Sequence, residues 1–152
     1  MRTATATVII GMAAAFVAVS THAASSSATM TVSAVVVARA IAKIESQPAS
    51  LTISPADLAS GYVDVPTAAR VHVRTNSANG YLLVFEATAP LFTSVAVAGA
   101  GDPVSLPSGN GWLFEPFTVI DVDTTLSFRF YLSAGVRPGS YPWPLDISVR
   151  TP

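Results

Sequence analysis

The sequence predicts an all-β sandwich. Short apolar segments alternate with polar residues at the two-residue period of a strand, most strictly over Arg70–Arg74 and Thr125–Leu132. Gly, Pro and Asn interrupt the chain roughly every 8–12 residues, which is typical of strands joined by turns. Only one short segment carries helix signals, and no internal repeat or second domain is apparent. These observations favour a single sandwich domain.

Residues 1–23 have the features of a removable secretory signal peptide. Arg2 gives a positive start, residues 8–19 form an apolar core, and Thr21-His22-Ala23 has the small-x-small pattern of a cleavage site. The apolar run is too short to span a bilayer, and the mature chain offers no other span. We therefore expect export to the periplasm, to the cell surface or a fimbrium, or to the medium.

Residues 24–38 are predicted to form an N-terminal strand ahead of the sandwich domain, which covers residues 39–152. Ala28–Ala38 alternates, and one face carries Met30, Val32, Ala34 and Val36, while the other begins with threonines and a serine. Those four residues are the candidate donor-strand positions. Three alternatives stay open: the strand pairs within its own domain, it is donated to a neighbouring subunit, or the segment is disordered or has another role.

The remaining elements follow from local patterns. Ser54-Pro55-Ala56-Asp57 predicts a one-turn helix with Ser54 as its cap, and Asn79-Gly80 predicts a hairpin turn. Valines of Arg70–Arg74 and the apolar residues of Leu126–Leu132 are expected to face the core. Strands are predicted over 41–45, 51–53, 62–65, 70–74, 81–87, 92–97, 112–114, 118–120, 125–132 and 145–150, with a loop at 99–103 and a turn at 121–124.

Composition excludes several classes of function. The chain has a net charge of −1 and no basic cluster, so it offers no electrostatic basis for binding nucleic acid. It has no cysteine, which removes thiolate metal sites and cysteine nucleophiles. No Gly-x-Ser-x-Gly motif is present, and no acid–histidine pair is evident that could activate a nucleophile. We therefore expect no enzymatic activity, no cofactor and no metal.

Two groups of polar residues are possible sites. Asp121 and Asp123, with Glu115 upstream, lack the glycine and the distal glutamate of a calcium loop, so a solvated turn is expected. His72 lies between Arg70 and Arg74 on a strand, and a metal site there would need carboxylates from elsewhere. A solvent-facing strand predicts the same residues, and we favour that interpretation.

The two tryptophans, Trp112 and Trp143, both lie beside loops. Aromatic rings in such positions can stack on sugars, which makes Trp112 and Trp143 candidate glycan-stacking residues. Packing at the end of a sandwich explains them as well.

Both ends of the chain resemble one family. Arg137-Pro138-Gly139-Ser140-Tyr141-Pro142-Trp143-Pro144-Leu145-Asp146-Ile147-Ser148-Val149 resembles the final strand of spore-coat-protein-U-like domains, which include the archaic chaperone–usher pilins. Residues 26–34 are similar to the N-terminal donor segment of those subunits. The resemblance implies an incomplete immunoglobulin-like sandwich that lacks its last strand and receives a neighbour's N-terminal strand. It implies further copies of the chain, or a periplasmic chaperone and usher, as partners.

Taken together, the sequence predicts an exported structural or adhesion subunit, pilin-like or a surface coat protein active in biofilm formation, that assembles by β-strand addition. The alternative is a monomeric secreted carbohydrate-binding sandwich that uses Trp112 and Trp143 on a surface glycan.

Overall fold

The computed structural model describes residues 30–152. The predicted signal peptide, together with residues 24–29 of the predicted N-terminal strand, lies outside the described residues. The chain divides into two units, residues 1–34 and residues 35–152. In the first unit the described residues 30–34 contain no helix or strand. The second unit holds all the regular structure of the described residues.

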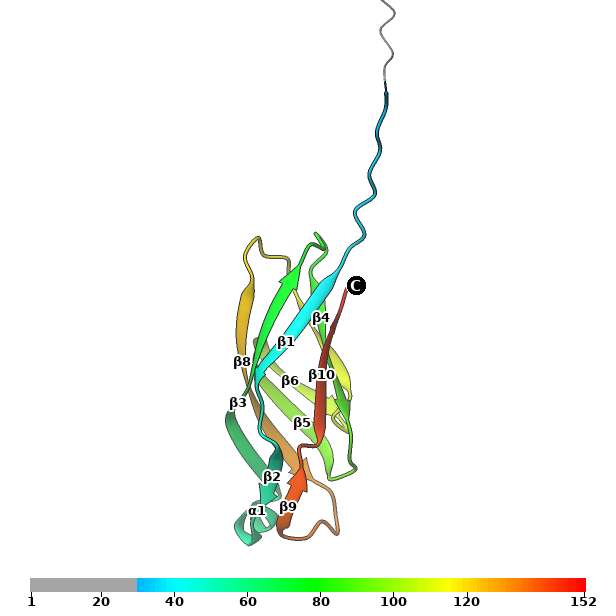
Figure 1. Ribbon diagram of the computed structural model, residues 1–152. Coiled ribbons are helices and arrows are strands. Elements are labelled where there is room, and N and C mark those ends of the chain that lie inside the picture. Colours follow the sequence, from blue (N-terminus) through cyan, green and yellow to red (C-terminus); the bar gives the residue numbers. More distant parts are fainter. Residues whose placement is uncertain (1–29) are drawn as a thin grey trace, which may run out of the picture. The chain divides into compact units, whose positions relative to one another are not determined.

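Residues 35–152 form an all-β sandwich, as the sequence predicted (Figure 1). Every strand pairing is antiparallel. The larger sheet has the order β1 (Ala40–Ser46), β3 (Tyr62–Thr75), β8 (Val122–Leu132), β5 (Phe92–Gly99) and β6 (Gly101–Pro107). The smaller sheet has the order β10 (Leu145–Arg150), β4 (Tyr81–Ala87) and β7 (Gly111–Glu115), and β2 (Ser50–Ile53) pairs with β9 (Gly139–Pro142).

The core lies between the two main sheets and is built from the alternating side chains that the sequence pointed inward. Phe85 of β4 meets Phe128 of β8 edge to face, with ring centroids 6.2 Å apart. Val71 and Val73 of β3 are buried, as are Leu126, Phe128 and Phe130 of β8. The inward registers predicted for these two strands are therefore confirmed.

The single helix of residues 30–152, α1 (Pro55–Ser60), is confirmed together with its start signal. Ser54 caps the helix by accepting a hydrogen bond from the Asp57 backbone N–H, and the Asp57 carboxylate accepts one from the Ser54 backbone N–H. Gly61 ends the helix in the left-handed conformation, at φ 81°. In the part of the chain that the structure describes, no helix is long and apolar enough to cross a membrane.

Several strand boundaries differ from the prediction. Tyr62–Val65 and Arg70–Arg74 are two ends of one strand, β3, because an irregularity between Val65 and Ala69 lets pairing with β8 continue past Pro66. The predicted loop 99–103 instead holds the turn between β5 and β6, and residues 118–120 form no strand. Asp123 belongs to β8 and not to a turn.

The predicted hairpin at Asn79-Gly80 is wrong. β3 and β4 belong to different sheets, so this turn carries the chain across the sandwich. Glycine is required at position 80 because a Cβ atom there would lie 2.2 Å from the backbone oxygen of Glu115. The sequence predicted a residue tolerant of positive φ, and Gly80 has a φ of 79°, but the change of sheet was not predicted.

The predicted opening strand over Ala28–Ala38 is not paired within the domain in its described part, and its donation to a neighbouring subunit stays a prediction. Residues 30–39 form no strand, and the first strand, β1, begins at Ala40. Asn76 holds the residue just before β1 in place: its side-chain oxygen accepts a hydrogen bond from Arg39 N, and its backbone N–H donates to Arg39 O. The first strand that pairs within the domain is therefore β1, where the sequence predicted a strand over residues 41–45.

Candidate functional site

The four candidate donor residues lie in a segment that is exposed and unpaired. Met30, Val32, Ala34 and Val36 are all exposed, and the large side chains of the segment, Val35 and Val37 among them, have exposed fractions between 77% and 90%. One backbone contact is made within residues 35–152, where Val37 O accepts a hydrogen bond from the Asn76 amide. An apolar run with alternating residues is thus presented without a strand partner in the described part of the chain.

Within residues 30–152 the two main sheets have four edge strands, β1 and β6 in the larger sheet and β10 and β7 in the smaller one, and β1 lies next to β10. β1 is hydrogen-bonded to β3 alone, and β10 is hydrogen-bonded to β4 alone, so each is the terminal strand of its sheet within residues 30–152. The two strands lie close together on one side of the sandwich (Figure 1). Near one end the Gln47 side chain donates a 3.5 Å hydrogen bond to Leu145 O, which joins the two sheets there. Each edge carries backbone donors and acceptors available to an added strand.

The two tryptophans occupy different environments. Trp112 on β7 is 60% exposed, and Phe114, two residues along the same strand, is 53% exposed. They pair with Val84 and Leu82 of β4, so these four side chains share the outer face of the smaller sheet. Trp143 instead packs edge-on against Phe128 and Phe130, with centroid distances of 5.8 and 5.6 Å. The structure does not bring Trp112 and Trp143 together, and Trp143 serves core packing.

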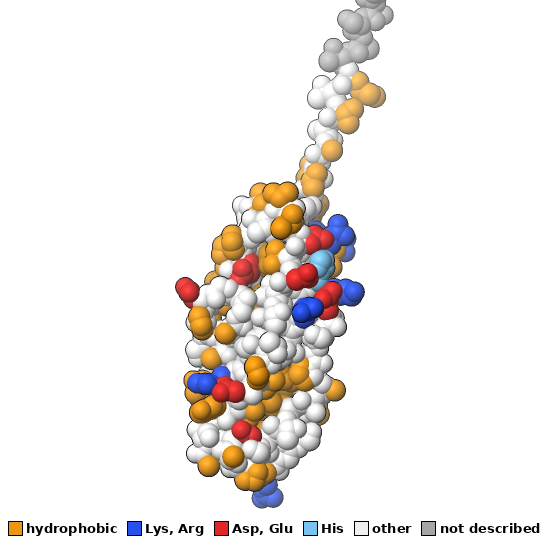
Figure 2. Space-filling model, turned by 90° about the vertical axis from the view of Figure 1, so that its left-hand side faces the viewer, with side chains coloured by type: hydrophobic (Ala, Val, Ile, Leu, Met, Phe, Trp, Pro, Cys, Tyr) orange, Lys and Arg blue, Asp and Glu red, His pale blue; other side chains and the backbone are white. Residues whose placement is uncertain are grey.

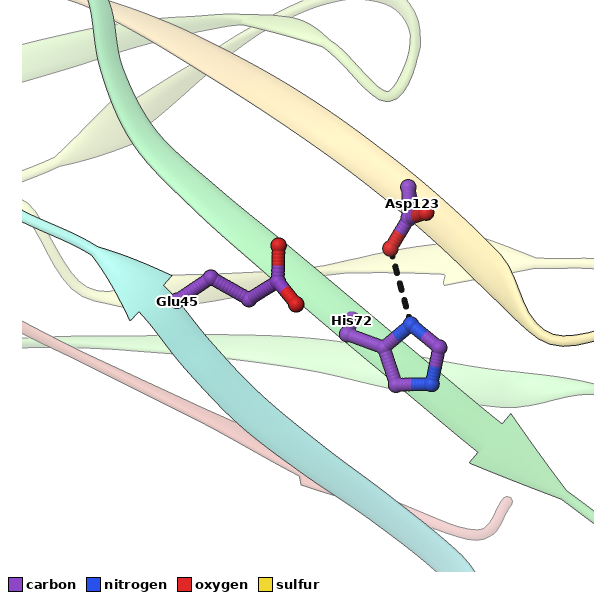
Figure 3. Close-up of side chains that lie close together, drawn as sticks. All are labelled: Glu45, His72 and Asp123. Carbon is purple, nitrogen blue, oxygen red and sulfur yellow. Dashed lines mark hydrogen bonds and ion pairs between the residues drawn. The ribbon is translucent and has the colours of Figure 1, made fainter.

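A polar cluster lies on the outer face of the larger sheet, centred on His72 of β3. The His72 Nδ1 atom is 2.8 Å from Asp123 Oδ1 on β8, and Nε2 is 3.5 Å from Asp121 Oδ2. Glu45 of β1 approaches from the other side, and one ligand atom from each of Glu45, His72 and Asp123 lie within 4.8 Å of one another (Figure 3). Figure 2 shows acidic and basic side chains gathered around the histidine on this face.

This cluster corrects one prediction made from the sequence and adds one residue that the sequence did not indicate. Asp121 and Asp123 do not belong to an isolated solvated turn, because both contact His72. The sequence did not indicate Glu45. The register between β1 and β3 shifts between Ile44 and Ser46, and Glu45 is the extra residue of this bulge. The i, i+2 spacing of the two aspartates did indicate a shared face, but nothing in the sequence placed that face beside β3.

The electrostatics of the cluster centre on the imidazole. The hydrogen bond to Asp123 raises the pKa of His72, and the charges of Asp121 and Glu45 act in the same direction. Asp121 is held from its other side by Arg74, whose Nε lies 3.3 Å from Asp121 Oδ2. The carboxylates thus favour a positive centre at the imidazole.

In comparisons with known proteins, no family model, no curated protein and no solved structure matches this chain. The resemblance to spore-coat-protein-U-like domains therefore stays a prediction.

Proposed function

We propose that this protein is an exported structural subunit, pilin-like or of a surface coat, that assembles by donating its N-terminal segment as a β-strand to a neighbouring copy. One observation carries the proposal: the apolar, alternating segment 30–37 is exposed and has no strand partner in the described residues. The first strand of the domain, β1, is formed by residues 40–46 instead. Contiguous exposed apolar surface of this kind is typical of interaction sites. Export itself rests on the features of residues 1–23.

The free edges of β1 and β10 support the acceptor half of the proposal. An added strand gains main-chain hydrogen bonds from an edge, and its alternate side chains supply specificity. The smaller sheet has three strands against five in the larger one, so addition to β10 extends the smaller sheet. Removing a valine side chain such as Val32 or Val36 from water contributes about 1.5–3 kcal/mol.

The experiment is sedimentation of the mature chain, residues 24–152, refolded from denaturant at high concentration. We expect concentration-dependent oligomers that are lost in Val32→Arg and Val36→Arg, because a charged side chain cannot enter an apolar contact. Thr31→Arg is the matched control, since position 31 lies on the opposite, polar face of the predicted strand. A peptide of residues 28–38 added in trans should cap the acceptor edge and shorten the oligomers.

Each outcome has a definite consequence. A wild-type chain that stays monomeric at all concentrations would contradict self-assembly. Oligomers that persist in both valine variants would show that another surface associates. A chaperone and usher are the remaining proposed partners, and capture of the wild-type chain but not of Val32→Arg by a periplasmic chaperone would assign the segment to that partner.

A second candidate function is favoured by Trp112 and Phe114. Their exposed rings lie on one face of β7 and are flanked by Leu82 and Val84, which makes an apolar platform suited to the C–H faces of sugars. Retardation of the monomer in polysaccharide gels that is lost in Trp112→Ala would support a carbohydrate-binding module. Phe117→Ala is the control, because Phe117 is an exposed aromatic residue in the loop after β7.

A further inference from the structure

The environment of His72 calls for a positive centre that a neutral imidazole does not supply. Both ring nitrogens lie near carboxylate oxygens, Nδ1 at 2.8 Å from Asp123 and Nε2 at 3.5 Å from Asp121. A neutral imidazole carries a single N–H, so one nitrogen directs its lone pair at an oxygen. Two additions relieve that repulsion: a second proton on the ring, or a metal ion between nitrogen and carboxylate.

We propose that Glu45, His72 and Asp123 bind a divalent transition-metal ion. The three side chains come from the neighbouring strands β1, β3 and β8, and they converge on the outer face of the sheet (Figure 3). Ligands of one Zn²⁺ lie about 2.0–2.2 Å from the ion and so at most roughly 4 Å from each other. The ligand atoms here lie within 4.8 Å of one another, and rotation of the exposed Glu45 and Asp123 side chains closes the difference.

A second feature of the cluster matches a metal-bound histidine. A ligating imidazole characteristically donates its other N–H to a carboxylate, which fixes the ring orientation. With Nδ1 on the metal, Nε2 carries the N–H of the ring and lies 3.5 Å from Asp121 Oδ2, and the same oxygen lies 3.3 Å from Arg74 Nε. Asp121 is therefore a positioning residue, and the chain Arg74–Asp121–His72 orients the imidazole toward Glu45 and Asp123.

Cationic side chains on the same face oppose the metal and must be weighed. Lys43 is paired with His72 across β1 and β3, and Arg70 and Arg74 flank it along β3. Arg74 is already engaged with Asp121. Lys43 is exposed, and its flexible stem lets the ammonium group move into water. The ligands themselves carry negative charge, on the carboxylates of Glu45 and Asp123, which attracts a cation.

The donor set selects the class of metal. Imidazole suits zinc, copper, nickel and iron, whereas calcium takes six to eight oxygen ligands. One nitrogen and two carboxylates therefore favour Zn²⁺ over Ca²⁺. Residues 30–38 supply no ligand, so metal binding does not require the donated segment.

The test uses the mature chain, residues 24–152, freed of metal with EDTA and titrated with Zn²⁺ at pH 7.5. We expect one Zn²⁺ per chain by calorimetry and, at a hundredfold excess over the dissociation constant, a rise of the thermal midpoint by roughly 5 °C or more. His72 is the single histidine of residues 24–152, so its Nδ1 resonance reports metal binding directly.

Variants separate the roles of the residues. His72→Gln should abolish the Zn²⁺ response, and Glu45→Gln or Asp123→Asn should weaken binding at least tenfold. Asp121→Asn should weaken binding roughly 10–100-fold, with the stoichiometry unchanged, as for other partners of ligating histidines. Asp146→Asn, an exposed acid on β10, is the matched control and should bind like the wild type.

Three results would overturn the proposal. The first is a folded wild type that shows no heat of binding and no thermal shift in millimolar Zn²⁺. If NMR then shows a single protonation of His72, the positive centre is a proton. The second is an undiminished response in His72→Gln. The third is an equal response to Ca²⁺, which would make this a site for oxygen ligands alone.

Discussion

The Asp64 carboxylate accepts two hydrogen bonds from the Arg129 guanidinium, at 2.6 Å from Nε and 2.8 Å from Nη2. The two residues are direct partners across β3 and β8, on the outer face of the larger sheet. The Arg129 guanidinium also lies 4.4 Å from the centre of the Tyr62 ring. This two-point contact holds the register of the two strands on one side of the β3 irregularity.

The Asp64–Arg129 pair predicts a dependence of stability on pH. The hydrogen bonds from Arg129 lower the pKa of Asp64 below its usual value. A carboxyl group whose pKa is depressed by folding stabilises the fold above its unfolded pKa of about 3.9, and that contribution is lost as the pH falls through the folded pKa. The midpoint temperature of thermal unfolding of Asp64→Asn should therefore lie slightly below that of the wild type at pH 6, and the difference should disappear near pH 2.

The measurement is thermal unfolding of both chains from pH 6 to pH 2. The effect is small because both side chains are partly exposed and screened by water. Salt should reduce it further. A difference that stays constant across this range would show that Asp64 contributes through its shape and not through its charge.

Core packing gives a prediction with an internal control. Phe85→Ala removes a buried ring that meets Phe128, and we expect the free energy of unfolding to fall by about 3–5 kcal/mol. Phe114→Ala removes a phenylalanine side chain from an exposed position on β7 and should change the free energy of unfolding by about 0.5 kcal/mol or less. Urea denaturation measures both, and comparable losses would mean that Phe114 is covered in solution.

Local chemistry explains which elements could be predicted from the sequence. The cap at Ser54, the alternation in β8 and the apolar run of β4 each depend on neighbours in the chain, and all three are confirmed. The order of strands in the sheets depends on which edges meet, and no local pattern encodes that. The Asn79-Gly80 turn illustrates the limit, since its conformation was predicted and its role as a crossover was not.

The candidate sites divide in the same way. The apolar face of Met30–Val36 is a property of a single segment, so the sequence displayed it directly. Alternation indicates which side chains share a face once a strand partner is present, and in the described residues the segment has no such partner, so its strand form stays a prediction. The cluster around His72 joins three strands, and a bulge decides which way Glu45 points. Long-range register of this kind is visible only in the folded chain.

The close approach at Gly80 leads to the last prediction. A Cβ atom there would lie 2.2 Å from Glu115 O, and the residue also has a φ of 79°. Gly135 has a similar φ of 85°, but a Cβ atom on it would meet nothing within 4 Å, so Gly135→Ala isolates the cost of the left-handed backbone, about 1–2 kcal/mol. Gly80→Ala should exceed that cost by about 1 kcal/mol or more, because the backbone at the end of β7 must move. Equal losses for the two variants in urea denaturation would mean that the end of β7 yields freely and that the crossover does not depend on this contact.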